Sequence, residues 1–156
     1  LVSLDGRVVA VISSGGGENI AFGISAALAR RVVPALVEDG RFEHPYIGVT
    51  LLGLTPDLAR ANGMATPRGV LVTAVDEDGP AAGVVRGGTE IRVVDGRRVR
   101  VGGDVILAID GERIQTTEDL GSYLALQTRP GDTVELTLLR DGTELTVEVE
   151  LGARPA

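Results

Sequence analysis

The chain of 156 residues is long enough for one domain of about 100 residues and part of a second. It contains no cysteine, which excludes disulfides, thiolate metal sites and cysteine nucleophiles. All 15 basic residues are arginines, yet the net charge is −7, and this negative balance argues against nucleic acid as a partner.

The first 40 residues predict a hairpin, a loop and a helix. Asp5-Gly6 separates two apolar runs, which favours a β-hairpin closed by a type I′ turn. The loop SSGGGEN follows, but no Lys-Ser/Thr pair accompanies it, so we do not expect a phosphate loop. Ser25 is suited to cap a helix that ends near Gly40 and contains Pro34. A segment this short does not bury a stable core alone, and its strand-like opening without methionine predicts a piece of a longer protein.

The segment 41–45 predicts a linker, because charged residues cluster there and a proline follows. Residues 46–151 then contain enough strands and helices for a complete domain, and 152–156 form a tail. The Asp-Gly pairs at 95–96 and 141–142 predict two further hairpins.

Two helices are expected in this second domain. The first starts with Thr55 as N-cap and Pro56 in the first turn. The second starts with Thr117 as N-cap and ends at Pro130-Gly131.

No catalytic or metal-binding pattern is present. His44 is the only histidine and precedes a proline, which is typical of a turn residue, and no serine has a G-x-S-x-G context. The acidic run 76–78 lacks the alternating ligands of a calcium loop. We therefore expect no catalytic residue, no metal site and no cofactor.

The stretch YIGV at 46–49 has a specific physical use. Successive backbone N–H groups in a glycine turn can hold an anion, and the missing Cβ lets a ligand come close. A peptide carboxylate can lie on these amides while the peptide adds as a strand beside the segment that follows. An apolar pocket beside the third helix would then provide specificity. The candidate peptide-binding residues are Tyr46, Ile47, Gly48, Val49, Leu51, Leu120, Tyr123 and Leu124.

Six stretches in order, YIGV, GVLVTAV, GPAAG, GGDVILAIDGERI, TTEDLGSYL and GDTVELTLLRDG, resemble a PDZ domain of the bacterial and archaeal HtrA (Deg) type. The resemblance covers 46–151. It implies a mainly β fold with two or three helices, a circularly permuted and partly open β-barrel or sandwich, with YIGV as the carboxylate-binding loop. This chain departs from the family pattern by an inserted hairpin at about 88–102.

Residues 1–40 resemble the C-terminal segment of an HtrA-family trypsin-like protease domain, an incomplete β-barrel. In that likeness the loop 14–18 borders the specificity pocket and the strand 19–24 lines it. The family's catalytic triad precedes such a segment, so we expect this chain to be inactive alone.

The resemblance implies the peptide-binding module of an HtrA-like serine endoprotease of protein quality control. Its partners would be C-terminal or hydrophobic segments of peptides or unfolded proteins, and not nucleic acid. The parent would be homotrimeric or larger through its protease domain, and would reside in the cell envelope, periplasmic or extracytoplasmic, with a membrane anchor upstream. The alternative is a non-catalytic PDZ-type scaffold or adaptor. A third reading, the PDZ of another class of protease, is disfavoured by the upstream segment.

Overall fold

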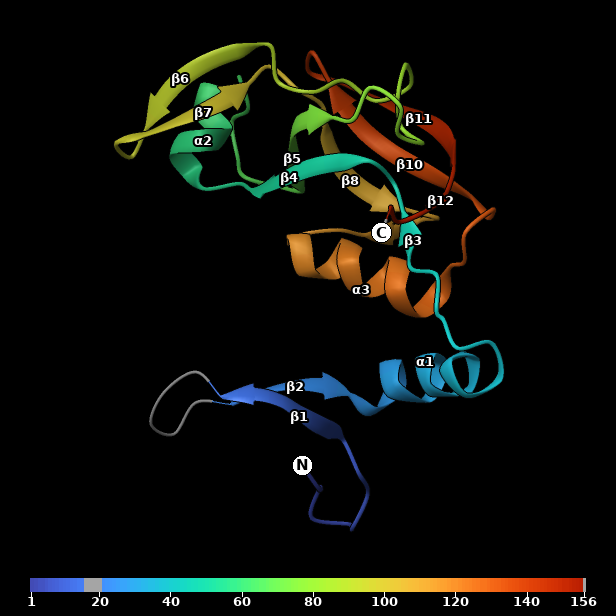
Figure 1. Ribbon diagram of the computed structural model, residues 1–156. Helices are drawn as coiled ribbons and strands as arrows, with labels where there is room; N and C mark the ends of the chain where they lie inside the picture. Colours follow the sequence, from blue (N-terminus) through green and yellow to red (C-terminus); the bar gives the residue numbers. More distant parts are fainter. Residues whose placement is uncertain (16–20, 156) are drawn as a thin grey trace. The chain divides into compact units, whose positions relative to one another are not determined.

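The computed structural model describes residues 1–15 and 21–155 and divides the chain into two compact units, Leu1–Glu43 and His44–Ala156 (Figure 1). Among the described residues, no helix has the length and apolar character needed to cross a membrane. Each unit is described by itself below.

The first unit is a strand pair followed by a helix. Its elements are β1 (Ala10–Gly15), β2 (Ala21–Ser25) and α1 (Ala26–Glu38). The Ser25 hydroxyl accepts the Leu28 amide at 3.2 Å, which confirms the predicted N-cap. The glycine-rich loop and the predicted strand 19–24 fall partly on residues 16–20, which lie outside the described part of the chain.

The hairpin predicted at Asp5-Gly6 is wrong in its extent. One isolated bridge, between Val2 and Val8, crosses that turn together with hydrogen bonds from the Ser3 amide to Arg7 and from the Val9 amide to Leu1, and β1 pairs with β2 instead. The predicted type I′ turn is also wrong, because Gly6 has positive φ but Asp5 does not. The apolar side chains around the turn are exposed, so no packed face holds a longer ladder together.

The second unit is built on an open antiparallel sheet in the order β11-β10-β8-β5-β4, with β9 paired to β8. The strands of this sheet are β4 (Val49–Gly53), β5 (Val70–Val75), β8 (Val105–Ile109), β9 (Glu112–Arg113), β10 (Thr133–Arg140) and β11 (Thr143–Glu150). Two small pairs complete it: β3 (Pro45–Tyr46) with β12 (Gly152–Ala153), and β6 (Glu90–Val94) with β7 (Arg97–Val101).

The turns of the hairpins follow the Asp-Gly pairs. Asp95 and Asp141 adopt φ of +50°, and the glycine after each also has positive φ, as a type I′ turn requires. Both predicted hairpins, β6–β7 and β10–β11, are therefore confirmed. A third pair, Asp110-Gly111, makes the β8–β9 turn, which the sequence reading did not single out.

Two helices lie in this unit, α2 (Pro56–Ala61) and α3 (Thr117–Gln127). The predicted cap of α2 at Thr55 is confirmed, since its hydroxyl accepts the Leu58 amide. The predicted cap of α3 is wrong by one residue. Thr116 caps it, because Asp119 completes a capping box with Thr116 and Thr117 is already helical.

Each face of the sheet carries its own apolar cluster. The larger one joins the sheet to α3 and is hereafter the α3-side core; it includes Ile47, Val72, Leu120 and Leu136. The smaller one, the α2-side core, joins the sheet to α2 and to the β6–β7 hairpin and includes Leu58, Leu71 and Val101. Figure 1 shows α3 on one side of the sheet, with α2 and the hairpin on the other. The mainly β, PDZ-like fold with three helices is thus confirmed, and the described sheets are open and not closed into a barrel.

Candidate functional site

The loop between β3 and β4 presents two backbone amides that have no acceptor among the residues that the structure describes. The carbonyls of Ile47 and Gly48 accept the amides of Ala81 and Asp76 at 3.0 and 2.9 Å. Within the described residues, no hydrogen bond is donated by the amide of Ile47 or Gly48, although both residues are buried, Ile47 being 5% exposed. A sheltered N–H without an acceptor is costly, so these two consecutive donors are suited to an anion.

Gly48 is required by the fold of the loop itself. Its φ is +78°, and an added Cβ would lie 3.0 Å from Cα of Gly79 and 3.1 Å from Cδ of Pro80. The missing Cβ would therefore have pointed at this neighbouring turn of the same domain. The expectation that Gly48 serves mainly to admit a ligand is corrected accordingly: its backbone angle and the close turn already demand glycine.

Tyr46 supports the loop from the side. Its hydroxyl is hydrogen-bonded to the carboxylate of Asp76. The backbone amide of Asp76 in turn donates to the Gly48 carbonyl. Its backbone pairs with Gly152 of β12. Tyr46 therefore holds the loop to both of its neighbours, and Asp76 is a supporting residue that appeared in the sequence only as part of a solvated turn.

Strand β4 lies at the edge of the sheet and pairs with β5 alone in the described structure. Val49 and Leu51 pack against the α3-side core and stay half-buried. Thr50 and Leu52 alternate with them and are exposed. An edge strand that follows directly on free amides is the geometry needed for the addition of another strand.

The predicted α3 residues reach the same apolar cluster in different ways. Leu120 is 1% exposed and Leu124 is also buried, and both belong to the core that contains Ile47. Tyr123 is half-buried, and its hydroxyl donates to Oδ2 of Asp110 at 2.9 Å. Burial first, and then the Asp110 carboxylate, raises the pKa of the Tyr123 phenol. The structure thus brings the eight candidate residues to one region, with Leu120 and Leu124 serving the core of the domain as well.

A buried ion pair that sequence reasoning missed lies at the base of the inserted hairpin. Nε and Nη2 of Arg140 donate to the two carboxylate oxygens of Asp104 at 2.8 and 2.7 Å. Asp104 is 1% exposed and also accepts the Arg86 amide at 2.8 Å, while Arg140 donates to the Val84 carbonyl at 2.7 Å. The hydrogen bonds to Asp104 raise the pKa of Arg140 further above its ordinary value. This pair fixes the segment from which the hairpin leaves the sheet.

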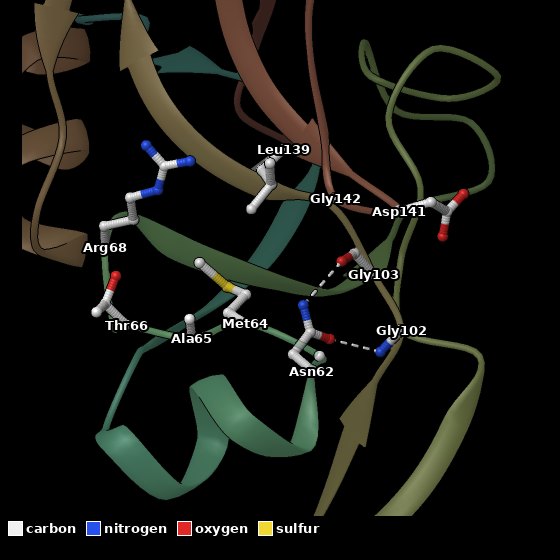
Figure 2. Close-up of a pocket in the computed structure, with 11 residues that line it drawn as sticks. Asn62, Met64, Ala65, Thr66, Arg68, Gly102, Gly103, Leu139, Asp141 and Gly142 are labelled. Atoms are coloured by element: carbon white, nitrogen blue, oxygen red, sulfur yellow. Dashed lines mark hydrogen bonds between the residues drawn. The ribbon is translucent and has the colours of Figure 1, made fainter.

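A hollow of about 530 Å³ lies between the end of α2 and the β10–β11 turn (Figure 2). Figure 2 shows the Asn62 side chain at one edge of it, where Asn62 accepts a hydrogen bond from the Gly102 amide at 2.6 Å and donates one to the Gly103 carbonyl at 3.4 Å. Both polar ends of Asn62 are therefore used within the domain. Asn62 therefore holds the segment that follows the hairpin at Gly102 and Gly103.

The described residues contain no cluster of three or more His, Asp or Glu side chains able to hold a metal ion.

Comparison with known proteins places residues 45–151 in the PDZ domain model. A probable periplasmic serine endoprotease, DegP-like, of Pseudomonas fulva is 35% identical over 161 residues, which cover 100% of this chain and 30% of that protein. A corresponding protein of Rhizobium meliloti is 33% identical and is covered to 29%. The chain thus spans about three tenths of the length of these relatives.

Solved structures agree with this likeness. The HtrA-type protease AlgW with a decapeptide has 28% identity and a TM-score of 0.71, over 95% of this chain and 42% of that one.

Proposed function

Because this chain belongs to the PDZ domain family and is related along its length to HtrA-type serine proteases, we propose that it binds the free C-terminal end of an extended peptide. The observation that carries this proposal is the pair of buried amides of Ile47 and Gly48, which have no acceptor in the described structure and lie directly before the edge strand β4.

The two parts of this site would act on different parts of the ligand. The terminal carboxylate accepts hydrogen bonds from the two amides, in a partly buried place where each such charged bond is stronger than in water. The extended chain of the peptide then pairs with the free edge of β4. Its terminal apolar side chain lies on the face of Val49 and Leu51, next to α3.

The carboxylate contact is tested by comparing two labelled decapeptides that have the same apolar C-terminal sequence and differ only in a free acid or an amidated terminus. We expect the amide to bind about tenfold more weakly or worse, because it leaves the loop donors without their anion. Fluorescence anisotropy titration gives both dissociation constants. Equal affinity for acid and amide would contradict the role of the loop.

We also propose that the whole protein is a serine endoprotease of the cell envelope. The support is the similarity of nearly the whole chain to proteins named as periplasmic endoproteases, and the exposed apolar residues of the first unit, which suit it to pack against a larger protease domain. An assembly of three or more copies through that domain belongs to the same proposal.

Two measurements test it. This chain alone should not hydrolyse casein, because its single histidine, His44, precedes a proline in the linker and no serine has a G-x-S-x-G context. Turnover blocked by a serine-directed reagent would contradict that. In the coding sequence that precedes Leu1, a GNSGGP motif with an earlier His and Asp is expected, and its absence would favour a scaffold without protease activity.

A further inference from the structure

The inserted hairpin forms one wall of a groove whose other wall is the exposed face of β4. The groove has a volume of about 470 Å³. It is lined by Thr50–Gly53 of β4, Thr55 and Leu58 at α2, Thr73 and Ala74 of β5, and the hairpin residues Val94, Asp95 and Arg97–Arg100. In Figure 1 the hairpin lies on the side of the sheet opposite α3. The groove is therefore separate from the apolar pocket beside α3.

The two faces of β4 define which part of a bound strand meets the groove. Val49 and Leu51 face the α3-side core, whereas Thr50 and Leu52 face the other way and line the groove. Side chains of a strand alternate between the two faces of a sheet. A peptide added beside β4 would consequently send every second side chain toward α3 and the others toward the hairpin.

The charges on the hairpin indicate the chemistry of those other side chains. Arg97, Arg98 and Arg100 line the groove together with a single acid, Asp95. In the described part of the chain none of these three arginines forms an ion pair, whereas Arg60, Arg68, Arg86, Arg92 and Arg140 all do. In a chain with a net charge of −7, the groove thus concentrates unpaired positive charge.

We propose that the inserted hairpin is a specificity element that selects acidic side chains at alternate positions of the extended peptide bound beside β4. This inference rests on the proposed function, since it uses the same peptide register. Arginines hold carboxylates by paired N–H donors. Arg97, Arg98 and Arg100 are exposed, so each contact with a carboxylate is modest and is screened by salt. The apolar pocket beside α3 and the basic groove would together read the two faces of one strand.

The experiment uses labelled decapeptides with one common apolar free-acid terminus. Two peptides carry glutamate at two alternate upstream positions, in one register or shifted by one residue, and two carry glutamine there instead. We expect glutamate in one register alone to tighten binding about three- to tenfold over glutamine, the size of two exposed ion pairs. The advantage should shrink in 0.5 M salt, where the Debye length is about 4 Å.

Two protein variants identify the source of any preference. In the variant R97Q/R98Q/R100Q the glutamate advantage should disappear while the glutamine peptides bind as before. The control R60Q/R68Q/R86Q removes the same charge from arginines that lie in ion pairs outside the groove, and it should keep the advantage.

The outcomes separate the two proposals. Glutamate and glutamine peptides of equal affinity, or an advantage that survives in the hairpin variant, would overturn the role of the hairpin and leave carboxylate binding intact. If both variants lose the glutamate preference alike, the preference depends only on net charge, and the proposed role of the hairpin is overturned too. If no free-acid peptide binds at all, the proposed function fails and this inference fails with it.

Discussion

At Gly48 the backbone angle φ determines which residues the loop between β3 and β4 can accept at this position. The φ of +78° is unfavourable for any residue with a Cβ, and that atom would press on Gly79 and Pro80. We expect Gly48→Ala to lower the free energy of unfolding by about 1–2 kcal/mol. Urea denaturation followed by circular dichroism measures the change.

The matched control is Gly53→Ala at the other end of the same region, because an added Cβ there has no atom within 4 Å and the backbone is not in the left-handed region. It should change the free energy of unfolding by less than about 0.5 kcal/mol. Equal losses at the two glycines would show that Gly48 is not specially constrained.

The Asp104–Arg140 pair is the polar contact whose loss should cost most. Replacing Asp104 by alanine leaves the Arg140 guanidinium, with 20% side-chain exposure, and the Arg86 amide without their shared acceptor. We expect Asp104→Ala to destabilise the domain by about 3–5 kcal/mol. The exposed pair of Arg68 and Glu144 is the comparison, and Glu144→Ala should cost less than about 1 kcal/mol. A small loss at Asp104 in thermal or urea unfolding would contradict this assignment.

These residues also show what the sequence alone can reveal. The YIGV loop is recognisable because its glycine and its neighbours are contiguous, and the anion-binding role follows from local geometry. Asp104 and Arg140 stand 36 positions apart, and nothing in either local context indicates a partner. Leu120 and Leu124 are predicted beside the apolar pocket next to α3, but helical spacing does not tell a pocket wall from a core residue.

Helix α3 starts from a capping box that determines its response to pH. The Asp119 carboxylate accepts the amides of Gln115 and Thr116 at 3.0 and 2.9 Å, which lowers its pKa below the ordinary value of 3.8. The folded state favours the charged form of the Asp119 carboxylate. The stabilisation of the fold by this charged carboxylate is therefore present above pH 3.8 and is lost as the pH falls through the lower pKa of the folded state.

Alanine substitutions at the two threonines at the start of α3 distinguish the N-cap residue from its neighbour. Thr116→Ala should lower the free energy of unfolding by about 1 kcal/mol at neutral pH, because it removes the hydroxyl that accepts the Asp119 amide. Thr117→Ala, at the first helical position, should cost less than about 0.5 kcal/mol. Carbon-detected NMR titration gives the pKa of Asp119, and an ordinary value there or equal losses at both threonines would contradict the capping box.

Elements were predictable where turn chemistry and burial agree. The β10–β11 hairpin combines an Asp-Gly turn with buried Val134, Leu136 and Leu138, and it forms as predicted. The Asp5-Gly6 turn has the same dipeptide without a buried face, and only one bridge forms. The α3 cap lies at Thr116 and not at Thr117 because Asp119 forms its reciprocal hydrogen bonds with Thr116. Two adjacent threonines leave this choice open in the sequence.

At the scale of the whole molecule, stability is concentrated in the second unit. Every buried apolar residue recorded in the described part of the chain lies between Ile47 and Leu151, and helix α1 of the first unit has none. Strands β1 and β2 instead leave Val11, Ile12 and Ile24 exposed. The boundary between the units falls after Glu43, within the charged segment that precedes the PDZ domain.

A chain shortened to residues 44–156 should therefore fold alone, with a free energy of unfolding within about 0.5 kcal/mol of that measured for the full-length chain. Shortening it further to 49–156 removes the β3–β12 pairing and Ile47, and this should cost about 2–4 kcal/mol, because a buried isoleucine is lost from the α3-side core. In hydrogen exchange of the full chain, amides of β8 and β10 should be the best protected and those of the first unit should exchange early. If the 44–156 chain fails to fold, or if β1 and β2 are as well protected as β10, the two units stabilise each other, and the first cannot be regarded as a segment that awaits a larger domain.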